Sequence, residues 1–138
     1  MRQAPVTPSG LLRHANEFLH AAELVLKDSN EVSIPSYFLF GRSIELSFKA
    51  FLLSRGMRIS ELKSKKFGHD LSALLDEALS RGIGELIVID ELAEGVIRLL
   101  SEDYLNKRFE YRETGGIYLL PLINVTKRVA KELSELTL

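Results

Sequence analysis

The chain has 138 residues, with 18 Lys and Arg against 19 Asp and Glu, three His and no Cys, for a formal net charge of −1. This is the length of one domain with a hydrophobic core, so we expect a single domain over residues 1–138 with a flexible start at residues 1–9. The absence of Cys excludes disulfides and thiolate chemistry, and the short apolar runs exclude a membrane span. No signal peptide precedes Leu11, so we expect a cytoplasmic protein.

Helical periodicity governs the first half of the chain. The first helix should begin after Ser9, a good N-cap residue, and run to about residues 28–30. A second helix should begin near Ser33, with Pro35 in its first turn, and end at Gly56. This second helix is the most hydrophobic one, being apolar over more than one stripe. We therefore expect it to lie at the centre of the domain.

The sequence of the second half of the chain predicts shorter helices joined by extended connections. Within the helix at 88–105, Gly95 costs about 1 kcal/mol relative to Ala, which we attribute to close packing against a neighbour. The expected elements are a short helix or turn at 59–62, helices at 71–82, 88–105 and from about Pro121 onward, and extended connections at 83–89 and 116–122. The sequence therefore predicts an all-α protein, an antiparallel four- to five-helix up-and-down bundle.

Charge is distributed unevenly along these elements. Residues 40–70 carry seven basic and three acidic side chains, residues 71–106 carry two and eight, and residues 107–138 carry six and four. One interpretation is that solvated helix faces simply vary in charge. The other is that the basic stretches converge on an anionic ligand, while the acidic stretch faces away or meets a partner.

Polar residues interrupt the hydrophobic second helix at regular spacing. Gly41, Glu45 and Lys49 follow one another at four-residue steps, and Arg42 stands beside Gly41. Glu45 and Lys49 could form an ordinary surface ion pair, worth a few tenths of a kcal/mol. If the helix is central, however, these charges are partly buried and must be paired. We then expect their partners at residues 69–70 and 107–112.

Two further segments carry candidate site residues. Asp70 suits the N-cap of the third long helix, and His69 could cap, orient a neighbour or transfer a proton, because histidine in general titrates near neutrality. The segment at 107–112 mixes cations with the aromatic Phe109 and Tyr111. Such a mixture suits stacking on a base while cations hold phosphate, and it equally suits anchoring a loop to a bundle.

Most standard catalytic signatures are absent. The sequence has no Gly-rich phosphate loop, no His-Glu-x-x-His helix and no Gly-x-Ser-x-Gly elbow. His14, His20 and His69 could form a metal site only with carboxylates from elsewhere. We expect neither a metal nor a cofactor.

Three motifs in order resemble one family. The string Ser-Ile-Glu-Leu-Ser-Phe-Lys-Ala-Phe-Leu-Leu-Ser at 43–54, the Gly-His-Asp-Leu at 68–71 and the Arg-Phe-Glu-Tyr at 108–111 are similar to motifs of the HEPN superfamily (higher eukaryotes and prokaryotes nucleotide-binding domains). Together they cover roughly residues 35–125. The resemblance implies a helical bundle, often a homodimer. It also implies functions that range from RNA cleavage to nucleotide binding and partnership with a nucleotidyltransferase.

The ribonuclease branch of the family carries Arg, four to six residues and then His on a late helix. No His follows His69 here, so the late helices lack that motif. Arg13 and His20 have six residues between them, but they lie on the first helix, and we interpret the match as coincidence.

The leading hypothesis is therefore a non-catalytic nucleotide- or RNA-binding domain, a homodimer that could belong to a toxin–antitoxin or nucleotidyltransferase-partner system. In it, cations hold phosphate, Glu45 holds the cations, Phe109 or Tyr111 offers a stacking face, and residues 69–70 fix the entrance of the next helix. The candidate ligand-binding residues are Arg42, Glu45, Lys49, His69, Asp70, Arg108, Phe109, Tyr111 and Arg112.

Two rival hypotheses remain. One is a divergent metal-independent ribonuclease, with His69 as general acid or base and Arg108 stabilising developing charge. The other is a protein-interaction module whose acidic stretch, residues 71–106, binds a nucleotidyltransferase or toxin partner.

Overall fold

The computed structural model of the protein describes residues 5–27, 33–111 and 117–138. Within these residues the chain forms six α-helices and one 3₁₀ turn, without a strand. The elements are α1 (Pro8–Lys27), α2 (Ile34–Ser54), α3 (Ile59–Leu62), α4 (Leu71–Ser80), the 3₁₀ turn η1 (Ile83–Glu85), α5 (Glu91–Leu105) and α6 (Ile123–Ser134). The expected all-α bundle is confirmed. None of the described helices is long and apolar enough to cross a membrane.

Capping residues set most of the helix starts. The Ser33 side chain accepts a hydrogen bond from the backbone N–H of Ser36 at 3.3 Å, and Pro35 occupies the first turn of α2. Asp70 caps α4 in the same way, as predicted. Helix α5 begins later than the expected residue 88, because Asp90 is its N-cap.

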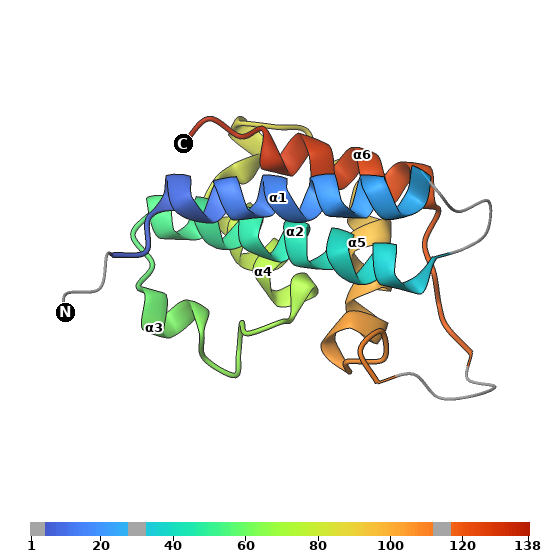
Figure 1. The fold of residues 1–138 in the computed structure, drawn as a ribbon. Helices are drawn as coiled ribbons and strands as arrows, with labels where there is room; N and C mark the ends of the chain where they lie inside the picture. Colours follow the sequence, from blue (N-terminus) through green and yellow to red (C-terminus); the bar gives the residue numbers. More distant parts are fainter. Residues whose placement is uncertain (1–4, 28–32, 112–116) are drawn as a thin grey trace.

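Helix α2 lies at the centre of the bundle, as its composition predicts. Thirteen of its 21 residues are buried, and it packs against α1, α4, α5 and α6. Helices α1 and α2 lie side by side and run in opposite directions, and α6 lies against both and runs in the direction of α2 (Figure 1). Any charged residue in the middle of α2 is therefore surrounded by other helices.

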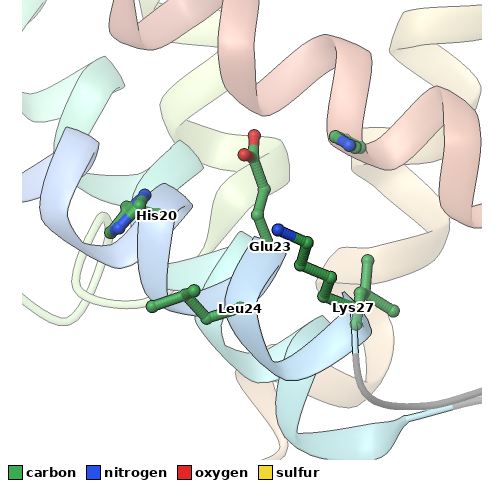
Figure 2. Close-up of a pocket in the computed structure, with 6 residues that line it drawn as sticks. His20, Glu23, Leu24 and Lys27 are labelled. Atoms are coloured by element: carbon green, nitrogen blue, oxygen red, sulfur yellow. The ribbon is translucent and has the colours of Figure 1, made fainter.

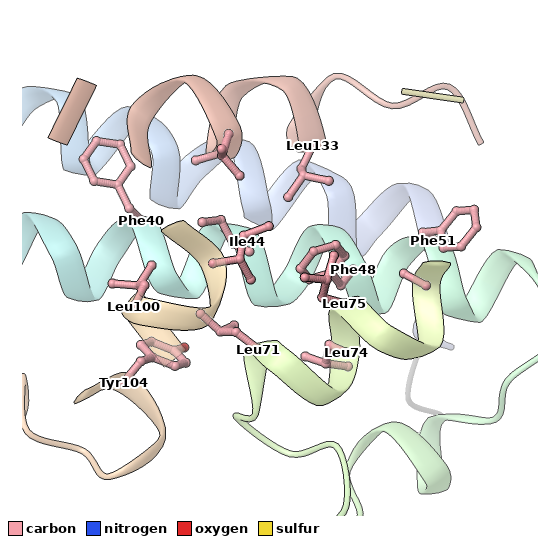
Figure 3. Close-up of a cluster of buried hydrophobic side chains, with 14 of the residues drawn as sticks. Phe40, Ile44, Phe48, Phe51, Leu71, Leu74, Leu75, Leu100, Tyr104 and Leu133 are labelled. Atoms are coloured by element: carbon pink, nitrogen blue, oxygen red, sulfur yellow. The ribbon is translucent and has the colours of Figure 1, made fainter. Parts of the chain in front are cut away.

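The hydrophobic core forms where these helices meet α2. Large apolar side chains of α2 face those of α4, α5 and α6 (Figure 3). The labelled members are Phe40, Ile44, Phe48 and Phe51 of α2, Leu71, Leu74 and Leu75 of α4, Leu100 and Tyr104 of α5, and Leu133 of α6. All of them are buried, and burying side chains of this size contributes about 1.5–3 kcal/mol each.

Close helix packing occurs at Gly41 and not at the predicted Gly95. A Cβ atom at Gly41 would lie 2.5 Å from a ring carbon of Tyr104, so the two helices can approach only because this position has no side chain. A Cβ atom at Gly95 would meet no described atom within 4 Å. The spatial neighbour of Gly41 cannot be read from the sequence, which explains the wrong assignment.

Candidate functional site

A buried carboxylate at the middle of α2 organises a polar cluster. The side chain of Glu45 is fully buried. Its Oε2 accepts hydrogen bonds from Nη1 of Arg42 at 2.8 Å and from Nζ of Lys49 at 3.0 Å. Its Oε1 accepts from Nδ1 of His69 at 2.8 Å and from the hydroxyl of Tyr104 at 2.7 Å. With two donors on each oxygen, the carboxylate is fully satisfied, which offsets the cost of burying its charge.

Helical spacing accounts for two of the four donors. Arg42 and Lys49 precede and follow Glu45 by three and four residues, so all three lie on one side of α2. His69 reaches the carboxylate from the loop before α4. The loop is held there because Phe67 is buried and the Asp70 carboxylate accepts the backbone N–H of Ala73 at 3.0 Å.

Tyr104 is the member of the cluster that sequence reasoning missed. It lies near the end of α5, where periodicity predicts only an apolar contact. Its ring packs over Gly41, stacks on Phe38 with ring centroids 6.1 Å apart, and meets the His69 ring edge-on at 6.2 Å. The sequence does show a Tyr at the end of an apolar helix face and a Gly one turn before Glu45. Neither residue indicates that the two pack against each other.

The surroundings of Glu45 keep it ionised. Burial by itself would raise the pKa of Glu45, but the Lys49 cation, the His69 hydrogen bond, the Arg42 cation and the Tyr104 hydrogen bond together hold it below its usual value. Burial and the neighbouring Glu45 charge raise the pKa of Tyr104 far above that of a free tyrosine, so its hydroxyl remains a donor. One carboxylate thus faces the two cationic side chains of Arg42 and Lys49, so positive charge exceeds negative charge in the cluster.

The cluster presents two of its donors outward. The side chains of Arg42 and His69 are 32% and 49% exposed, whereas Lys49 is 12% exposed. Because Nδ1 of His69 donates to Glu45, its Nε2 points away from that carboxylate. The Arg42 guanidinium lies 5.8 Å from the centre of the Phe18 ring and uses one N–H on Glu45. Both side chains are therefore held in place and still have polar groups to offer to a ligand.

The basic and aromatic loop lies outside this cluster. Nη1 of Arg108 donates to the buried carboxylate of Asp103 at 2.7 Å, and the other Asp103 oxygen accepts the backbone N–H of Leu119 at 2.9 Å. Phe109 is 5% exposed and stacks between Tyr37 and Tyr118. Of the two roles predicted for this segment, base stacking or anchoring a loop to the bundle, the geometry agrees with anchoring. These side chains hold residues 117–120 against the bundle.

The remaining predicted residues divide as follows. Asp70 acts as the cap of α4 and makes no hydrogen bond to Glu45. Tyr111 is 72% exposed, and Arg112 lies outside the described residues. The structure thus brings together Arg42, Glu45, Lys49 and His69 of the predicted set, adds Tyr104, and places Arg108 and Phe109 in a separate cluster.

A hollow with charged walls lies elsewhere on the molecule. It has a volume of about 390 Å³, lies on α1 and α6 and is lined by His20, Glu23, Leu24, Leu26, Lys27 and Lys127 (Figure 2). Its cations share the site with the Glu23 carboxylate, and no described salt bridge fixes any of its side chains to a buried partner. We therefore place the candidate site at the Glu45 cluster. Within the described ranges, no group of three or more His, Asp or Glu could hold a metal ion.

Comparison with known proteins gives one match. The model of the HEPN domain family matches residues 9–137, which is nearly the whole chain. Neither the curated proteins nor the solved structures yielded a match. The family match and the helical bundle agree with the motif order found in the sequence, and the chain therefore belongs to the HEPN family, a superfamily associated with nucleotide binding and RNA cleavage.

Proposed function

We propose that the protein binds a nucleotide or RNA without cleaving it, by holding a phosphate group between Arg42 and His69. The observation that carries this proposal is that two half-exposed donors are fixed on one buried carboxylate. Arg offers a planar set of N–H groups that matches phosphate oxygens, and hydrogen bonds between charged groups are the strong ones. Lys49 adds positive charge from behind the two donors.

Preorganisation is what such a cluster contributes to binding. A long cationic side chain normally loses rotamer freedom when it grips a ligand, which costs about 0.5–1.5 kcal/mol. Arg42 and His69 already have one atom each anchored on Glu45, at 2.8 Å in both cases, so part of that cost is met on folding. The net positive charge of the cluster favours an anion over a neutral ligand.

The proposal is tested by binding measurements on single variants. Calorimetry with ATP and fluorescence anisotropy with a labelled short RNA should show binding by the parent protein. Arg42→Gln removes a charge-assisted contact worth about 1.5–3 kcal/mol and should weaken both ligands roughly tenfold or more. Arg98→Gln is the matched control, because Arg98 is 38% exposed and also paired on a helix surface.

Two results would count against binding at this site. One is the absence of heat and of a thermal shift with every nucleotide and RNA tested. The other is an equal loss of affinity in Arg42→Gln and Arg98→Gln, which would mean that charge matters only in general.

One observation favours a second candidate, a divergent ribonuclease. The Glu45 hydrogen bond orients His69 and leaves Nε2 as the atom that could take a proton from a ribose 2′-hydroxyl. That oxygen would then attack the adjacent phosphorus and break its bond to the 5′-oxygen of the next nucleotide, giving a 2′,3′-cyclic phosphate. The leaving 5′-oxygen would take the proton held on Nε2 of His69, and Arg42 would stabilise the charge that develops on the phosphate. The role given earlier to Arg108 passes to Arg42, because Arg108 is paired with Asp103.

Incubation of labelled RNA separates the two candidates. The ribonuclease predicts cleavage that is lost in His69→Gln and in RNA with 2′-deoxy sugars. Binding without cleavage predicts intact RNA with the parent protein.

A further inference from the structure

A strongly basic segment leads directly into the candidate site. Residues 55–66, which join the end of α2 to the loop that carries His69, contain five basic side chains and one acidic one. His69 follows only three residues later. Positively charged side chains therefore lie along one continuous stretch of chain, which ends at His69 in the candidate site.

Three lysines in this segment pair with no acidic side chain among residues 5–27, 33–111 and 117–138. Arg58 pairs with Glu61 through a 3.2 Å contact, and the Arg55 guanidinium lies 5.0 Å from the centre of the Phe51 ring. The side chains of Lys63, Lys65 and Lys66 are exposed, and none of them forms a salt bridge in the part of the chain that the structure describes. Like charges this close repel one another, and a polyanion would relieve that repulsion.

The backbone that carries the lysines is fixed. Leu62 and Phe67 are buried at the two ends of the stretch, at 1% and 6% exposure. The carbonyl of Ser64 accepts the backbone N–H groups of Phe67 at 3.2 Å and of Gly68 at 2.8 Å. The three lysines thus extend from a closed turn that is packed against the core, and the Lys66 ammonium lies 5.2 Å from the centre of the Phe67 ring.

The length of this stretch distinguishes a polynucleotide from a mononucleotide. Lys63 and His69 are six positions apart, and the closed turn at Ser64 makes the path between them shorter than the about 20 Å of an extended chain. A nucleic acid strand presents a phosphate about every 3.4 Å of helix axis, so more than one phosphate fits along such a path. A mononucleotide carries all its phosphates at one end and can occupy only one end of the path.

We infer that Lys63, Lys65 and Lys66 form a second phosphate-binding surface, which holds the backbone of a polynucleotide while one of its phosphates lies between Arg42 and His69. The inference rests on the proposed function, since it extends the same site along the chain. Contacts to backbone phosphate carry no sequence information, so binding along this surface should be independent of base sequence.

The test measures the salt dependence of binding. Anisotropy with a 12-nucleotide RNA, and with DNA of the same sequence, is recorded over a series of salt concentrations, and ATP binding is measured in parallel by calorimetry. The variant replaces all three lysines, Lys63→Gln, Lys65→Gln and Lys66→Gln. The matched control replaces Lys127 and Lys131, two exposed lysines of α6, which lies on the far side of α1 from α3 (Figure 1).

We expect the parent to bind the oligonucleotide more tightly than ATP. Each phosphate contact in a single strand contributes about 0.7 to the slope of log K against log salt, so losing three contacts should lower the slope by about 2. ATP binding should stay unchanged in the triple variant, and the control should match the parent in both measurements. RNA and DNA should lose slope equally, whereas a loss with RNA alone would contradict a contact made only to phosphate.

The outcomes separate this inference from the function on which it rests. If the parent binds both ligands and the triple variant keeps the full salt slope, the lysine surface is wrong and the Arg42–His69 site stands. Loss of ATP binding in the triple variant would also overturn the inference, because the lysines would then belong to the same small site. If the parent binds neither ligand, the proposed function fails, and the inference fails with it.

Discussion

Glu45 is the residue on which the local structure of the site depends. Its carboxylate is the shared acceptor of Arg42, Lys49, His69 and Tyr104, and without it two cations would be left partly buried and unpaired. Breaking a buried ion pair by removing one partner costs about 3–5 kcal/mol. The cluster therefore links stability to the proposed site, because any change at Glu45 releases the two outward donors.

We predict that Glu45→Gln lowers the free energy of unfolding by about 3–5 kcal/mol in urea denaturation at neutral pH. Glu61→Gln is the matched control. Its carboxylate also pairs with an Arg three residues away, but it lies at the surface, where water screens the pair and its loss should change stability little. Equal stability losses in the two variants would contradict the claim that the buried Glu45 carboxylate stabilises the fold more than a surface carboxylate does.

The depressed pKa of Glu45 predicts a loss of stability in acid. Because its folded-state pKa lies below the unfolded value, the stabilisation is present above about pH 4.5 and is lost as the pH falls through the folded-state pKa. Denaturation of the parent across this range should show the decline, with Arg42, Lys49, His69 and Tyr104 as the groups that face the carboxylate. Glu45→Gln should lack this part of the decline, and an unchanged acid dependence in that variant would contradict the assignment.

At the residue scale, the sequence predicts those contacts of the site that join residues close together in one helix. Arg42, Glu45 and Lys49 lie within two turns of one helix, so their proximity follows from helix geometry alone. Tyr104 could not be assigned, because it is 59 positions from Glu45 and its hydroxyl finds the carboxylate only after α5 packs on α2. The positive charge of Arg108 suggests a place in the site, but in the structure Arg108 donates a hydrogen bond to Asp103, five residues before it.

At the scale of elements, Gly41 determines how closely α5 approaches α2. We predict that Gly41→Ala destabilises the protein by about 1–3 kcal/mol, because the new methyl group would displace the Tyr104 ring from 2.5 Å. Gly95→Ala is the matched control, since no described atom lies within 4 Å of a Cβ there and Ala is the better helix former by about 1 kcal/mol. Thermal denaturation should show opposite shifts, and stabilisation by Gly41→Ala would refute the close approach.

Most helix boundaries were predictable because they depend on nearby residues. Ser33, Asp70 and Gly56 occupy the cap and end positions that their chemistry favours. The sequence predicts too early a start for α5, because the apolar residues at 88 and 89 continue its periodic pattern, whereas the N-cap in the structure is Asp90. The 3₁₀ turn at Ile83–Glu85 replaces an expected extended connection. It follows Gly82, whose positive φ of 94° no periodicity argument can anticipate.

At the scale of the whole molecule, a nearly neutral chain carries a local basic surface. The net charge of −1 conceals a basic stretch at 40–70, which contains Arg42, Lys49 and the lysines at 63–66, and an acidic stretch at 71–106. The three-dimensional structure brings Arg42, Lys49 and His69 of the first stretch together on the Glu45 carboxylate. The homodimer and the partner protein implied by the family resemblance stay predictions.

The most direct test follows the three histidine side chains by NMR during titration with a short RNA. His14 and His20 lie on α1 and serve as internal controls in the same sample, because the described hydrogen bonds join neither of them to Glu45 or to its four donors. The account predicts that the imidazole signals of His69 shift in a saturable way while those of His14 and His20 stay in place. Saturable binding that leaves His69 unchanged, or that moves His20 instead, would contradict the assignment of the site.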